Sequence, residues 1–282
     1  MKVGLISPQG WLEVAEVLAE QAGQSPVLIL TVLAVVILLG RRKALYSALE
    51  ASGARVGKAT IDRIGYSFQA LALTLLLALP WPLLLGMLGW QLGQAVDGTE
   101  FTKAVAAAAA WVAPRLLFLR SIHLAALPHG LAAINFGWPD NRLRALRREL
   151  RWFMPGFLAA AFITILALTL GTTTLGGAAG KLALLTTLSV LATFFYRVLN
   201  PKREVLGDWM IQHPGILLAR LRYVWFPLLV AAPVAMAGLA MAGYVYTAGT
   251  LTARLIETLL LALLLVLAQQ LALRWLRLIR HR

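Results

Sequence analysis

The side chains best suited to metal binding or acid–base chemistry are few in this sequence. It has no cysteine and only four histidines, at positions 123, 129, 213 and 281. No His-Glu-x-x-His motif and no pair of histidines four residues apart is present, so the spacing gives little support to a zinc or di-iron site. We therefore predict no cofactor, no metal and no enzymatic activity. A membrane-embedded, lipid-modifying enzyme that uses His123, His129 and Asp140 is kept as an alternative.

One glycine-rich stretch, Gly176 to Leu182, is similar to a phosphate-binding loop. However, Leu175 stands where that motif begins with glycine, and Leu182 replaces the serine or threonine that follows the lysine. We interpret the stretch as a turn.

Ionisable residues inside long apolar runs are the default functional candidates of a membrane protein. Glu257 follows Arg254 by three residues, which favours a local ion pair near the outer interface over a proton relay. Arg115 comes near the end of its apolar run, and we expect its side chain to reach the cytoplasmic headgroups.

The composition indicates that lipid is the main solvent of this chain. Of its 282 residues, 60% are hydrophobic and 13% charged, and the mean hydropathy is +0.77. The net charge of +14 lies in short clusters between apolar runs, a pattern of membrane topology and not of a nucleic-acid-binding surface. We predict membrane lipids as partners and no nucleic acid.

Seven stretches are apolar enough to cross a membrane, for which about 20 residues are needed. We predict an all-α, polytopic membrane protein with about seven transmembrane helices in hairpins, joined by amphipathic cytoplasmic connectors. The stretches are Pro26 to Leu39, Ser67 to Leu92, Phe101 to Leu119, Trp152 to Leu170, Lys181 to Val198, Val224 to Tyr246 and Leu251 to Leu273.

The distribution of Lys and Arg predicts the orientation of the chain. With the N-terminus outside, only Lys2, Lys103, Lys181 and Arg254 of the 26 basic residues lie outside. We therefore expect a multi-pass protein of the bacterial inner membrane with a periplasmic N-terminus and a cytoplasmic C-terminus.

The predicted inner connectors, residues 41–66, 120–151 and 200–222, are long and amphipathic, as are helices that lie in the headgroup plane. Their basic clusters either bind anionic headgroups or only fix topology. The predicted lipid contacts are Arg41, Arg42, Lys43, Arg142, Arg144, Arg147, Arg148, Trp138 and Trp152.

Small residues and prolines modify the predicted helices. The spacing of Gly89 with Gly93, and the run Ala104 to Ala110, favour close helix packing over a pore lining. Prolines inside a helix remove hydrogen bonds and favour kinks, and kinked hairpins can tilt when bilayer thickness changes. The predicted kinks are at Pro80, Pro82, Pro227 and Pro233.

The run Leu127 to Leu150, LPHGLAAINFGWPDNRLRALRREL, resembles the inner-membrane domain of large MscS-like mechanosensitive channels, the MscK type. In that family a Gly-Leu-Ala segment is followed by His-Phe-x-Trp and a basic amphipathic stretch. Asn135 stands where the family has the histidine, and the run from Val56 to Leu92 is a second similarity. The matching residues are Gly130, Leu131, Ala132, Phe136, Gly137 and Trp138.

The resemblance implies a tension-gated channel that releases solutes in hypo-osmotic shock. It also implies a homo-oligomer, which is a heptamer if the chain is part of a full channel. We expect residues 1–24 to form a periplasmic or interfacial segment and residues 25–273 the transmembrane tension sensor. Residues 274–282 would be a basic cytoplasmic tail that leads to a pore helix and β-domain outside this chain. A small-solute transporter is kept as an alternative, although buried charges are scarce.

Overall fold

The computed structural model describes residues 8–22, 25–55, 64–95, 98–128, 130–136, 138–170, 175–200 and 222–280. Every regular element in these ranges is a helix, which confirms the all-α prediction. The helices are α1 (Pro8–Ala22), α2 (Pro26–Gly40), α3 (Arg42–Arg55), α4 (Ile64–Ala78), α5 (Pro80–Gly93), α6 (Glu100–Ala125), α7 (Leu131–Phe136), α8 (Asp140–Thr169), α9 (Leu175–Leu199), α12 (Arg222–Met241) and α13 (Val245–Arg280).

The predicted transmembrane segments correspond to these helices. Within the described residues, α6, α8, α9, α12 and α13 are long and apolar enough to span a membrane. A sixth span is formed by α4 and α5 if this bent pair is counted as one, and α2 is a shorter apolar helix of 15 residues.

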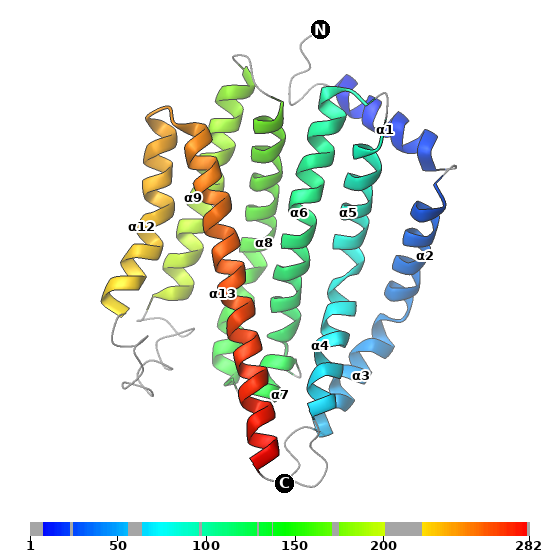
Figure 1. Ribbon diagram of the computed structural model, residues 1–282, viewed down its shortest axis with the longest axis vertical. Coiled ribbons are helices and arrows are strands. Elements are labelled where there is room, and N and C mark those ends of the chain that lie inside the picture. The colour runs from blue at the N-terminus through cyan, green and yellow to red at the C-terminus, as the bar shows by residue number, and fades with distance from the viewer. Residues whose placement is uncertain are drawn as a thin grey trace.

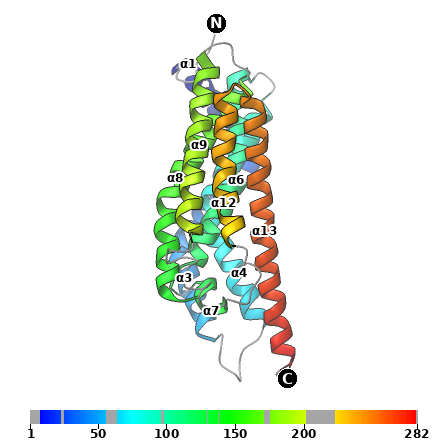
Figure 2. The ribbon, with the colours of Figure 1, turned by 90° about the vertical axis from the view of Figure 1, so that its left-hand side faces the viewer.

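The long helices stand side by side in a slab, broad in Figure 1 and narrow in Figure 2. Helices α2, α5, α6, α8, α9 and α12 each pack on the next in that order. Helix α13 runs diagonally, from α12 to α4 (Figure 1). We call the end of the slab that carries α1 the α1 end, and the opposite end, which carries α7, the α7 end.

Close contact between α5 and α6 depends on small side chains. A Cβ atom at Gly89 would lie 2.9 Å from the backbone nitrogen of Ala110 and 3.0 Å from the Cβ of Ala109. Gly86 faces Ala113 in the same way, at 3.4 Å. The predicted role of Gly89 and the alanine run in helix packing is therefore confirmed.

The polypeptide bends by 56° between α4 and α5. The bend lies at Leu79, directly before Pro80 and Pro82, neither of which has an N–H to donate to the preceding turn. In contrast, α12 is one continuous helix through Pro227 and Pro233.

Two predicted connectors differ from the structure. The basic stretch from Arg142 to Arg151 is not a separate interfacial helix, because it forms the first part of the 30-residue helix α8. Its apolar residues Leu143 and Leu150 are buried, and this face continues without a break into the span. Gly176 to Gly180, predicted as a turn, already belongs to α9. The connector over residues 201–221 lies outside the described residues.

The turn between α12 and α13 has a defined C-cap. Gly243 adopts a φ of +103°, and the backbone N–H of Tyr244 donates to the carbonyl of Leu239 at 3.0 Å. From α9, the ammonium group of Lys181 donates to the carbonyl of Met241 at 3.0 Å. This link fixes the hairpin to α9.

Candidate functional site

A charged group deep in the slab joins α6 to α13. The guanidinium of Arg115 lies 3.9 Å from a carboxylate oxygen of Glu257, and the Arg115 side chain is only 12% exposed. The same guanidinium stacks 3.6 Å from the ring centroid of Trp111 and donates to the Trp111 carbonyl at 2.7 Å. Arg254 binds the other Glu257 oxygen at 3.0 Å, as the sequence predicts.

The two residues of this ion pair lie well inside their helices. Arg115 lies about 22 Å along α6 from Glu100, and Glu257 lies about 18 Å along α13 from Val245. Arg115 also lies about 15 Å along α6 from Ala125, so the reach of its side chain toward the cytoplasmic headgroups stays a prediction. Helical side chains lean toward the helix N-terminus, so Arg115 turns back onto Trp111.

A second buried charge, Glu149, joins α8 to α9. Its side chain is 2% exposed and lies 2.9 Å from the Arg197 guanidinium. The indole N–H of Trp152 donates to the same carboxylate at 2.8 Å, and Arg148 lies 3.7 Å from it. Sequence reasoning missed Glu149 and Arg197. The three-residue spacing of Glu149 and Trp152 was the only available signal.

The predicted lipid contacts fall into two groups. Arg41, Arg42, Lys43, Arg144 and Arg148 have exposed side chains, Trp138 is exposed, and Arg147 is half-buried. In contrast, Arg142 is buried, with its guanidinium 5.8 Å from the Trp138 ring. Trp152 is half-buried and donates to Glu149. Arg142 and Trp152 therefore have partners within the protein.

The family-like motif forms a packed corner between α6 and α8. Gly130, Leu131 and Ala132 are buried, and a Cβ at Gly130 would lie 2.5 Å from the carbonyl oxygen of Ala125. Only glycine fits so close to that carbonyl. The N–H of Trp138 donates to the carbonyl of Ala132 at 3.2 Å. The side chains of Asn135 and Phe136, and Gly137, lie outside the described residues.

The residues of the enzyme alternative do not assemble into a metal site in the described part of the chain. His123 is half-buried, Asp140 is exposed, and His129 lies outside the described residues. No group of three His, Cys, Asp or Glu side chains able to hold a metal ion occurs among the described residues.

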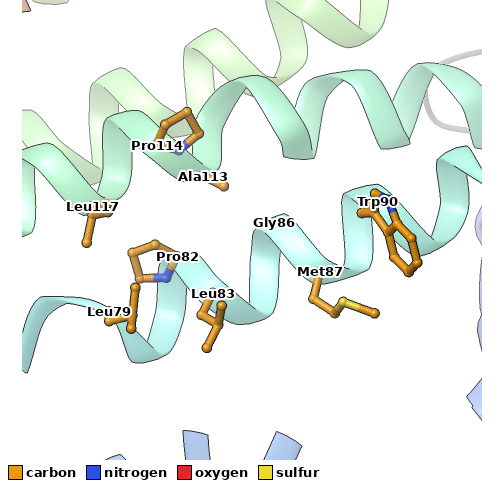
Figure 3. A pocket seen from close by; sticks show the side chains of 9 residues that line it. All are labelled: Leu79, Pro82, Leu83, Gly86, Met87, Trp90, Ala113, Pro114 and Leu117. Carbon is orange, nitrogen blue, oxygen red and sulfur yellow. The ribbon is translucent and has the colours of Figure 1, made fainter. Parts of the chain in front are cut away.

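An apolar groove opens between α5 and α6, just beyond the bend (Figure 3). It has a volume of about 340 Å³, and Ala113 and Leu117 of α6 point toward Pro82 and Gly86 of α5. The lining residues are Leu79, Pro82, Leu83, Gly86, Met87, Trp90, Ala113, Pro114 and Leu117. Such a groove matches the chemistry of a lipid acyl chain.

The fold and the charge clusters are those of a multi-pass membrane protein with ionic links between its spans. The family "Mechanosensitive ion channel inner membrane domain 1" matches residues 26–282, and the chain belongs to this family. It is 26% identical over 243 residues to the "Miniconductance mechanosensitive channel MscM" of Escherichia coli (strain K12). That alignment covers 83% of this chain and 21% of the relative, so the chain spans about a fifth of the relative's length. No solved structure matches it.

Proposed function

We propose that this chain is the tension-sensing, lipid-contact domain of a large MscS-like channel of the MscK type. The observation that supports this proposal best is the 56° bend between α4 and α5, next to an apolar groove. Membrane tension favours conformations that occupy a larger area in the plane of the bilayer. A bent span can change the area that it occupies in the bilayer plane by tilting or straightening, at a modest free-energy cost.

The packing around the bend defines what moves in this proposal. Gly89 holds the far half of α5 tightly against α6, and the apolar groove lies where the two helices meet next to the bend. Phe68, Leu75 and Leu76 of α4 are exposed apolar side chains that face the surface of the slab. Lipid would therefore act on α4, while α5 provides the fixed part.

Orientation and assembly are part of the same proposal. We place the α7 end at the cytoplasmic face, since it carries the exposed Arg41, Arg42 and Lys43. The N-terminus is then periplasmic and the C-terminus cytoplasmic, in the bacterial inner membrane. The domain would act in a homo-oligomer, a heptamer in the complete channel, that responds to hypo-osmotic shock.

Patch-clamp recording from spheroplasts without their own mechanosensitive channels tests this function. We expect the chain alone to give no tension-gated current, and a fusion to an MscS-type pore domain to open at a tension different from that of the pore domain alone. An unchanged opening tension in the fusion would contradict the sensing role. Robust conductance from the isolated chain would contradict the division between sensor and pore.

A further inference from the structure

Four basic side chains meet where α6 and α8 pack together at the α7 end. Arg120 and His123 lie one turn apart on α6, and Arg147 and Arg151 lie one turn apart on α8. Arg147, Arg151 and Arg120 are charged side chains that lie within electrostatic range of the His123 imidazole. We call these four residues the α6–α8 basic cluster.

The packing beneath the cluster is apolar and fixes the two helices relative to each other. Leu119 and Ile122 of α6 pack in one core cluster with Leu146 and Leu150 of α8. Arg120, His123 and Arg147 are half-buried above this core, and Arg151 is exposed. The basic groups therefore have limited freedom to move apart.

The cluster has no acidic partner in the described part of the chain. None of the ion pairs found there joins Arg120, Arg147 or Arg151 to a carboxylate. Arg147 donates only to the Leu143 carbonyl, at 3.4 Å. The Nδ1 atom of His123 is buried without a hydrogen-bond partner. Another cation, Arg42 of α3, and the phenol of Tyr46 lie within electrostatic range of Arg120.

Half-buried like charges repel each other, and a bound anion removes that cost. The dipole of α6 places only about half a negative charge at the C-terminal end of the helix, near Arg120 and His123. This is too little to neutralise three guanidinium groups. A phosphate group accepts charge-assisted hydrogen bonds from several arginines at once. Arg120 and His123 lie in the last two turns of α6, and Arg147 and Arg151 lie in the basic first part of α8.

We propose that the α6–α8 basic cluster binds the phosphate of an anionic phospholipid headgroup. Arg147 and Arg151 contact the phosphate from α8, Arg120 contacts it from α6, and the half-buried imidazole of His123 lies beside them. The proposal deepens the proposed function, and it rests on that function only for the position of the α7 end at a lipid–water interface.

Lipid binding to the purified full chain tests the site without any tension. Native mass spectrometry in detergent compares the binding of phosphatidylglycerol and phosphatidylcholine to the wild type, Arg147→Gln, Arg151→Gln and the double variant. We expect the wild type to prefer phosphatidylglycerol. Each substitution should weaken that binding about fivefold, and the double variant about thirtyfold.

Two controls separate a built site from general attraction to positive charge. Lys103→Gln removes one charge at the α1 end and should leave phosphatidylglycerol binding unchanged. Arg144→Gln removes an exposed arginine one turn from Arg147 on the same helix. The Arg144→Gln variant should lose less than half as much affinity for phosphatidylglycerol as the Arg147→Gln variant. Equal losses from Arg144→Gln and Arg147→Gln would overturn the proposal.

The remaining outcomes are equally decisive. Binding by the double variant at wild-type affinity, or no preference of the wild type for phosphatidylglycerol, overturns the site. Displacement of the lipid by inorganic phosphate, which then stays bound, would identify a soluble phosphate as the ligand and overturn the lipid assignment. If the double variant fails to fold, Arg147→Lys/Arg151→Lys retains both charges and should retain the lipid preference. A normal lipid preference together with an unchanged opening tension in the pore fusion would refute the sensing role alone.

Discussion

Arg115 of α6 and Glu257 of α13 lie 3.9 Å apart, although helices α7, α8, α9 and α12 lie between them along the chain. This ion pair connects the diagonal helix α13 to the middle of the slab. Because the Arg115 side chain is only 12% exposed, little water is available to replace the carboxylate as its partner. We expect it to contribute more to stability than the neighbouring pair of Glu257 with Arg254, whose arginine side chain is 80% exposed.

Glu257→Gln should lower the free energy of unfolding by about 2 kcal/mol, because it leaves the buried guanidinium of Arg115 without its charged partner. Arg254→Gln is the matched control, since it removes the other partner of the same carboxylate, and it should cost less than about 1 kcal/mol. Reversible unfolding in mixed micelles measures the free energy of unfolding of both variants. In a double-mutant cycle with Arg115→Met, additive effects of the two substitutions would show that the pair is not coupled.

Removing the buried negative charge of Glu149 should destabilise the fold more than removing that of Glu257. Glu149→Gln leaves Arg197 without its counter-charge, and we expect a loss of about 3–5 kcal/mol in the free energy of unfolding. Glu50→Gln, at an exposed glutamate of α3, should change it by less than about 0.5 kcal/mol. Replacing both partners, in Glu149→Leu/Arg197→Leu, should restore most of the stability. If this pair of leucines is as unstable as Glu149→Gln, the uncompensated charge is not the cause.

Gly89→Ala should separate α5 from α6, because the new Cβ would lie 2.9 Å from the Ala110 backbone nitrogen. We expect a cost of about 1–3 kcal/mol in the free energy of unfolding. The same substitution at Gly238 in α12, which has no atom within 4 Å of its Cβ position, should be neutral or stabilise by up to about 1 kcal/mol. Equal effects at the two positions would mean that close approach does not explain the glycine at 89.

Pro80→Ala/Pro82→Ala should reduce the bend between α4 and α5, because it restores the two missing N–H donors. The chain has no cysteine, so spin labels at Phe68→Cys and Trp90→Cys are specific. Full straightening of the 56° bend would lengthen the distance between them by about 4 Å. Pro227→Ala, within the continuous helix α12, should leave this distance unchanged. An unaltered distance in the double proline variant would show that tertiary packing, not proline, causes the bend.

Hydrophobic run length and small-residue spacing were sufficient to predict the spans and the contact of Gly89 with the alanine run. They were not sufficient for α8, because its basic first part looks like a separate interfacial helix when read alone. Only the burial of Leu143 and Leu150 shows that one apolar face continues into the span. The pairs of Glu149 with Arg197 and of Arg115 with Glu257 also escaped prediction, since each depends on which helix faces which. Local spacing found only the pair of Arg254 with Glu257.

The order of the helices across the slab is nearly their order along the chain, and this has a consequence for biosynthesis. Each new hairpin can dock onto the previous one as it leaves the ribosome and enters the bilayer, without waiting for distant sequence. Helix α13 is the exception, because it contacts both α12 and the much earlier α4. We therefore expect α13 to dock last of the described helices, once α12 and α4 are both in place.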